Sequence, residues 1–72
     1  MNKEELIIKI GLKIRELRIE RKLTLQQLSD KLDIEYNNLI RIEKGRTNPT
    51  IGTLYKISQV LGVGLVDIVD VE

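Results

Sequence analysis

Residues 23–45 read LTLQQLSDKLDIEYNNLIRIEKG, and this stretch decides how the chain folds. Thr24 can cap a helix, because Gln27 three residues later completes a capping box and leucines then recur at helical spacing. Asp33 breaks that run, and Gly45 stops a second periodic run that follows it. The stretch therefore predicts two short helices joined by a tight turn, at about residues 25–32 and 35–44.

A longer helix is expected before this stretch. Asn2 and Glu5 form a second possible capping box, so that helix should begin near the N-terminus. Gly11 within it allows close approach of another backbone. The side chains expected on its core-facing stripe are Ile7, Ile10, Ile14, Leu17 and the stem of Arg21. Off this stripe are three residues that are either scattered surface residues or part of a self-association face, namely Ile8, Leu12 and Ile19.

A loop and two further helices are expected after the stretch. Residues 45–50 form a loop by composition, and Thr50 is a good N-cap for a helix at about 51–61. The residues of that helix expected to face the core are Ile51, Leu54, Ile57, Val60 and Leu61. Gly62 ends it, and a short helix should run from Leu65 to about Val69. The last four residues alternate as a strand would, although terminal residues more often fray.

Length and composition indicate a single all-α domain over residues 1–72. This length is near the lower limit for a fold supported by its core alone, and without Phe or Trp that core must be aliphatic. The absence of Cys excludes a disulfide framework and a zinc finger, which fits a reducing compartment. Neither a long apolar run nor a signal-peptide pattern occurs, so we expect a soluble, cytoplasmic protein without a membrane partner.

Charge is distributed unevenly along the chain, although the formal net charge is only +1. Residues 13–22 carry five bases against two acids, and residues 41–56 carry four bases against one acid. Residues 57–72 carry three acids and no base. Such a chain can present one basic face to nucleic acid, but ordinary solvated helix faces would give the same pattern.

The sequence contains no catalytic or metal-binding constellation. Without His or Cys it lacks the commonest general base, the thiolate nucleophile and the usual transition-metal ligands. Ser29 and Ser58 lie in expected helices without a partner base, and no phosphate-binding glycine loop occurs. We therefore expect no enzyme activity, no cofactor, no metal and no small-molecule substrate.

The helix expected at about 35–44 carries side chains suited to double-stranded DNA. In a helix-turn-helix the second helix enters the major groove with its N-terminal residues at the base edges. Asn suits adenine and Arg suits guanine, so the candidate base-contacting residues are Tyr36, Asn37, Asn38 and Arg41. Phosphate contacts, which set the register, are expected from Gln26, Lys44, Arg46, Thr47 and Asn48. Any one such Asn or Arg on a short exposed helix is more often a solvated surface residue than a DNA contact. It is the order of these residues along the chain that favours DNA binding.

The sequence resembles the Cro/repressor-type (XRE) helix-turn-helix family over about residues 10–69. The residues that carry the resemblance are Ile14-Arg15-Glu16-Leu17-Arg18, Leu23-Thr24 with Leu28, Arg41-Ile42-Glu43-Lys44-Gly45, Asn48-Pro49-Thr50, Thr53-Leu54 and Leu61-Gly62-Val63. The resemblance implies a compact five-helix, lambda-repressor-like domain with its helix-turn-helix at about 24–44. It also implies a sequence-specific transcriptional regulator that usually binds a palindromic operator as a homodimer.

Particular residue roles also follow from the resemblance. It implies a partly buried structural ion pair between Arg18 and Glu43, which makes Arg18 part of the scaffold rather than of the DNA-facing surface. It places a dimer interface on the last helix, at Leu65, Val66 and Val69. Its base-reading positions map to Tyr36, Asn37 and Arg41, with Asn38 close by. Its phosphate-binding positions after that helix map to Lys44, Arg46 and Asn48.

Four positions depart from the family pattern, namely Leu25, Asp33, Glu35 and Ile40. Leu25 replaces a glutamine that touches phosphate, and Asp33 replaces the turn glycine but tolerates a left-handed backbone. Glu35 replaces a Ser or Thr cap, where an acid either favours a cytosine amino group or repels phosphate. Ile40 stands where a polar, exposed residue is common.

Two alternatives to an operator-binding regulator stay open. The chain could be an antitoxin or a restriction-modification controller of the same fold. It could also be a helix-turn-helix module that binds a protein instead of DNA, which the apolar Leu25 and Ile40 on the expected DNA face would favour.

Overall fold

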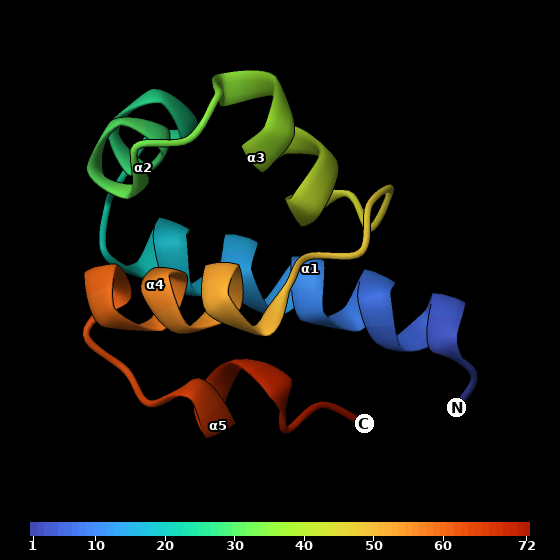
Figure 1. Ribbon diagram of the computed structural model, residues 1–72. Coiled ribbons are helices and arrows are strands. Elements are labelled where there is room, and N and C mark those ends of the chain that lie inside the picture. The colour runs from blue at the N-terminus through green and yellow to red at the C-terminus, as the bar shows by residue number, and fades with distance from the viewer.

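Five helices with short connections make up the structure, a computed structural model that describes every residue from Met1 to Glu72. They are α1 (Lys3–Glu20), α2 (Leu25–Leu32), α3 (Tyr36–Glu43), α4 (Ile51–Leu61) and α5 (Leu65–Val69). In Figure 1, α1 and α4 form a middle layer, with α2 and α3 above it and α5 below. The expected all-α class is confirmed, and the residues after α5 form no strand. None of the helices is long and apolar enough to cross a membrane.

The caps expected from the sequence fix the ends of the helices. The Thr24 hydroxyl accepts a hydrogen bond from the backbone N–H of Gln27 at 3.0 Å, and the Gln27 side chain accepts one from Thr24 at 2.8 Å. Thr50 caps α4 in the same way, and Asn2 caps α1. Asp33 has a φ of 55°, the left-handed conformation that its place in the turn requires. Glu35 makes no side-chain capping bond, and α3 begins at the next residue.

Eleven aliphatic side chains from all five helices form the core. From the stripe expected on α1, Ile10, Ile14 and Leu17 are buried, whereas Ile7 is only half-buried. Arg21 is exposed instead of contributing to the core, and its guanidinium Nε donates to the carbonyl oxygen of Leu61 at the end of α4.

One residue of α4 that was expected in the core is exposed, and one residue of α5 is buried although the sequence did not indicate it. Leu54, Ile57 and Leu61 are buried as expected, but Ile51 is 67% exposed. Ile51 is the first residue of α4, and it lines an open groove with residues of α1 and α5 instead of entering the core. Ile68 is completely buried and attaches the short α5 to the rest of the core.

Gly11 lies where α1 crosses the end of α3. A β-carbon at this position would lie 2.7 Å from the backbone carbonyl oxygen of Glu43, and closer still to that of Ile42. Backbone atoms cannot move aside as the end of a flexible side chain can. The expected close approach at Gly11 is therefore confirmed.

Gly11→Ala is expected to lower the free energy of unfolding by about 1–3 kcal/mol, because α1 and α3 must separate to admit the methyl group. Gly52→Ala is the matched control. Gly52 is an exposed residue of α4, and a β-carbon there would meet only the Thr50 hydroxyl oxygen, at an ordinary contact distance of 3.8 Å. Ala there is expected to raise the free energy of unfolding by about 0.5–1 kcal/mol, since it reduces backbone entropy in the unfolded chain. Urea denaturation measures both, and a stabilising Gly11→Ala would contradict the tight contact.

Candidate nucleic-acid interface

The helix pair α2–α3 is held on the core by one apolar side of each helix. Leu28 and Leu32 from α2 and Leu39 and Ile42 from α3 are all buried. In the turn between the helices, the backbone N–H of Ile34 donates to the carbonyl oxygen of Ser29 at 3.1 Å. The angle between α2 and α3 is therefore fixed, and the opposite side of α3 is left open to solvent.

The four candidate base-contacting residues lie on α3. Tyr36, Asn37 and Arg41 are exposed, and Asn38 is half-buried. Asn37 and Arg41 are four residues apart and so share one face of the helix. None of the four side chains makes a hydrogen bond or an ion pair within the protein. Their polar groups are therefore free to bind a ligand.

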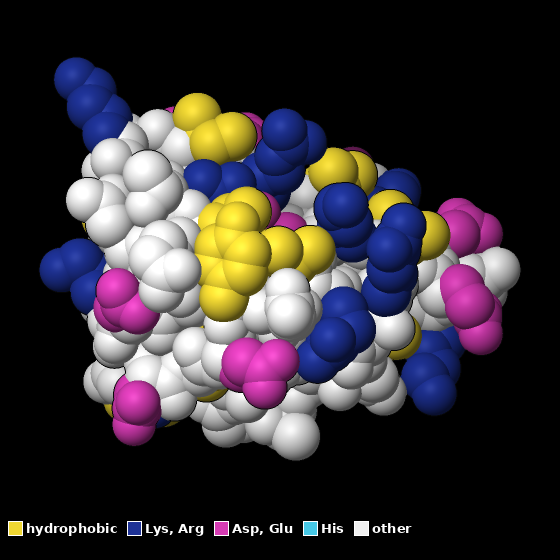
Figure 2. Space-filling view, turned by 90° about the horizontal axis from the view of Figure 1, so that it is seen from above, with side chains coloured by type: hydrophobic (Ala, Val, Ile, Leu, Met, Phe, Trp, Pro, Cys, Tyr) yellow, Lys and Arg dark blue, Asp and Glu magenta, His cyan; other side chains and the backbone are white.

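The candidate phosphate-contacting residues gather where α3 ends. Gly45, with a φ of 68°, stops the helix, and Lys44, Arg46 and Asn48 around it are exposed, while Thr47 is half-buried. Figure 2 shows this surface from the side of α2 and α3, with lysine and arginine side chains gathered over one part of it beside a hydrophobic patch. Gln26 on α2 differs from the others, because its amide already donates to Asp30 at 2.9 Å.

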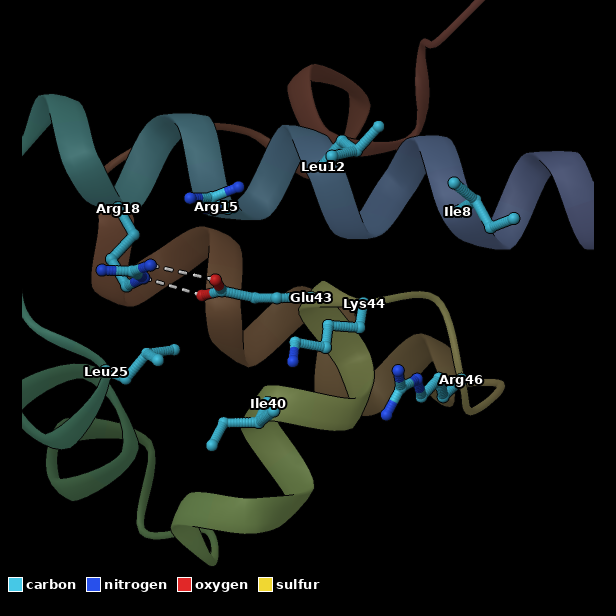
Figure 3. Close-up of a pocket in the computed structure, with 9 residues that line it drawn as sticks. All are labelled: Ile8, Leu12, Arg15, Arg18, Leu25, Ile40, Glu43, Lys44 and Arg46. Atoms are coloured by element: carbon cyan, nitrogen blue, oxygen red, sulfur yellow. Dashed lines mark hydrogen bonds and ion pairs between the residues drawn. The ribbon is translucent and has the colours of Figure 1, made fainter.

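Arg18 and Glu43 form a buried, bidentate ion pair between α1 and α3 (Figure 3). The guanidinium Nε and Nη2 donate to the two carboxylate oxygens at 2.8 and 3.1 Å. The remaining Nη1 donates to the carbonyl oxygen of Leu23 at 2.9 Å. One side chain thus ties together α1, the segment before α2, and the C-terminal turn of α3. All three guanidinium nitrogens of Arg18 are thus bonded within the protein, and the side chain is buried, so Arg18 belongs to the scaffold.

Two of the four positions that depart from the family pattern, Leu25 and Ile40, help to form a groove. Leu25 at the start of α2 and Ile40 on α3 are both half-buried, and their side chains point toward each other across a groove (Figure 3). The groove also includes Ile8 and Leu12 of α1, and its volume is about 500 Å³. Sequence reasoning placed these residues individually but not together, because three separate helices contribute them.

An apolar surface lies on the α5 side of the molecule. Val66 is 63% exposed, and Leu65 and Val69 are half-buried. Leu65 and Val69 line a groove of about 410 Å³ that α1 and the beginning of α4 complete, including the exposed Ile51. Two of the three residues expected at a dimer interface, Leu65 and Val69, therefore line this apolar groove, while the exposed Val66 lies beside them on α5 outside its lining. In Figure 1, α5 is separated from α3 by the α1–α4 layer.

A family model described as helix-turn-helix matches residues 14–68, which include α2, α3 and α4 completely. The chain belongs to this family. The domain is of the XRE-type helix-turn-helix kind, and several of its relatives are named as transcriptional regulators or repressors. The expected family is confirmed.

Two curated relatives illustrate the similarity of this helix-turn-helix regulator. It is 38% identical over 63 residues to an immunity repressor protein of Bacillus phage phi105, and the match covers 88% of this chain and 44% of the repressor. It is 37% identical over 60 residues to the HTH-type transcriptional regulator y4dJ of Sinorhizobium fredii, covering 83% of this chain and 78% of that protein. The chain thus spans less than half of the phage repressor and most of the second regulator.

A solved structure supports the fold of the regulator independently. The clp gene regulator ClgR from Corynebacterium glutamicum superposes with a TM-score of 0.87 at 23% identity. The superposition covers 90% of this chain and 83% of the ClgR chain. At that identity the likeness shows a shared fold and carries no statement about ligands.

Proposed function

We propose that the chain reads a specific operator in double-stranded DNA by inserting α3 into the major groove. One observation carries this proposal: α3 is fixed to the core by Leu39 and Ile42, while its outer side presents four polar side chains without partners in the protein. A rigid helix with free donors and acceptors can pair with base edges without first breaking its own bonds. The base-contacting residues would be Tyr36, Asn37, Asn38 and Arg41.

Phosphate contacts would come from the end of α3 and the loop after it. Lys44 and Arg46 supply positive charge, and Thr47 and Asn48 supply neutral hydrogen-bond donors. Gln26 already uses one of its two amide N–H groups on Asp30, which restricts the side chain and makes it the weakest member of the set. Because these contacts release counterions from DNA, the affinity should fall steeply as salt concentration rises.

The operator would be palindromic, because we also propose that the chain acts as a homodimer. The apolar surface around Leu65, Val66 and Val69 supports this proposal, and the exposed Ile51 extends it. In a two-fold dimer the same patch of each copy contacts the other, so one apolar surface is sufficient. The protein would work in the cytoplasm as a binding protein without catalysis, cofactor or small-molecule substrate.

Arg41→Ala is expected to relax the preference for one base pair in each half-site. The loss of one bidentate contact to a base typically removes about 1–3 kcal/mol of discrimination against the wrong base. Lys44→Ala is the matched control three residues later, at the C-cap of α3, and it should weaken binding to all sequences about equally. Fluorescence anisotropy with the preferred duplex and its single-base variants measures both effects. A uniform loss for Arg41→Ala would assign that residue to the phosphates.

Val66→Asp is expected to weaken the homodimer by at least about tenfold, since it places a charge on the exposed apolar residue of α5 within the proposed interface. Ile19→Asp makes the same change at a residue of α1 that is 53% exposed and outside this surface. It should leave the monomer–dimer equilibrium unchanged. Sedimentation equilibrium measures both variants. Equal behaviour of the two would place the dimer contact elsewhere.

A further inference from the structure

The groove between α1, α2 and α3 has an apolar floor, and none of the residues that form it is among the proposed DNA contacts. Leu12 is 52% exposed, and Ile8 lies one turn before it on the same face of α1. Leu25 and Ile40 complete the floor from the opposite side (Figure 3). Phosphodiester groups require hydrogen-bond donors and positive charge, which four aliphatic side chains do not supply. The floor is therefore suited to a ligand that brings apolar side chains.

The rim of the same groove is positively charged. Arg15, Lys44 and Arg46 line it, and none of them forms an ion pair within the protein. The one acid in the lining, Glu43, is already neutralised by Arg18. The rim therefore presents three unpaired cations, which complement a ligand carrying carboxylates around its apolar groups.

We propose that this groove binds an acidic, amphipathic helix of a partner protein and that this helix competes with DNA. A volume of about 500 Å³ is sufficient for several aliphatic side chains. A helix fits better than an extended peptide, because strand addition requires a sheet edge and this structure has no strand. Competition rests on the proposed function, since Lys44 and Arg46 would serve both the partner and the phosphates.

The acidic end of a second copy of the chain is a poor occupant of the groove. Its acids, Asp67, Asp70 and Glu72, lie in and after α5, which has only five residues. The apolar anchor of that helix, Ile68, is completely buried in its own core. The other apolar residues of α5, Leu65, Val66 and Val69, belong to the proposed dimer interface, so a second copy could not use them on the groove floor at the same time.

The test uses a helical peptide of about fifteen residues, stapled to hold the helix, with leucines at positions i, i+4 and i+7 and flanking glutamates. It is titrated into the ¹⁵N-labelled full chain without DNA and followed by chemical-shift changes. Leu12→Gln should weaken binding by about tenfold or more, because it removes a large apolar contact. Ile19→Gln is the matched control, equally exposed on the same helix but outside the groove, and it should bind like the wild type.

Two control peptides separate this docking from simple charge attraction. A peptide with serines in place of the leucines and one with glutamines in place of the glutamates should both bind much more weakly. Equal binding of the serine peptide, or equal effects of Leu12→Gln and Ile19→Gln, would overturn the proposed docking. In a second arm the stapled peptide should displace a DNA duplex, and a ternary complex would overturn the competition. If the chain bound no DNA at all, the proposed function would fail while the titration without DNA still decided the docking.

Discussion

Glu43→Ala is expected to lower the free energy of unfolding by about 3–5 kcal/mol, because it leaves the buried guanidinium of Arg18 without its counter-charge. Arg18 keeps only its bond to the Leu23 carbonyl, and it has little room to reach solvent since it is 9% exposed. A domain of this size is typically stable by only about 4–11 kcal/mol. The variant should therefore be close to unfolding, and urea denaturation followed by circular dichroism measures the loss.

Two controls show whether charge or packing is responsible for the loss at Glu43. Glu16→Ala removes an exposed acid from α1 and should change stability by less than about 0.5 kcal/mol. The double replacement of Arg18 by Met and Glu43 by Leu should recover much of the loss, because apolar residues of similar volume can substitute for a buried ion pair. A loss below about 1 kcal/mol for Glu43→Ala would mean that the pair does not hold α1 to α3.

Ile68→Ala is expected to destabilise the fold by about 2–5 kcal/mol, the range for truncating a fully buried aliphatic side chain. A helix of five residues is far too short to be stable alone, so α5 persists through its packing. Ile68 is the only residue of α5 that is completely buried. Its truncation should therefore release α5 as well as leave a cavity, and hydrogen exchange of the α5 amides would report that release.

Val66→Ala is the matched control for Ile68→Ala, since it shortens an exposed residue of the same helix. It should change the free energy of unfolding by less than about 0.5 kcal/mol when both variants are compared at concentrations where the chain is monomeric. Similar losses for the two variants would show that α5 is held by its general apolar character. They would contradict the specific role of Ile68 as an anchor.

The helix-turn-helix was predictable because the signals that set its boundaries are local. Thr24 and Gln27 cap the start of α2, and Asp33 makes the left-handed turn after it. Gly45, also in the left-handed conformation, stops α3. Each acts through hydrogen bonds or backbone angles within a few residues of itself. The order and the approximate bounds of all five helices could therefore be derived before any tertiary contact was known.

Burial at the ends of helices could not be predicted in the same way. Helical periodicity gives the direction of a side chain but not whether another element covers it. Ile51 lies at the right spacing from Leu54 to face inward, yet its side chain at the start of α4 is 67% exposed. Ile68 lies in a helix too short to show a period, so its burial follows only from how α5 packs against the core.

The candidate site was predictable along α3 and much less so across helices. The polar sequence of α3 indicated its candidate base-contacting residues directly. The Arg18–Glu43 pair joins residues 25 positions apart, and the family resemblance suggested it where spacing could not. The groove that unites Leu12, Leu25 and Ile40 emerged only from the packing of three helices.

Selection of the purified chain against a random duplex DNA library, with sequencing of the bound fraction, tests the central claim most directly. At low salt we expect strong enrichment of a two-fold-symmetric consensus, with half-sites that α3 of each copy would contact about one helical turn apart. Enrichment of an asymmetric single site would contradict the proposed homodimer. No enrichment even at low salt, where phosphate contacts are strongest, would contradict the proposal that α3 reads an operator.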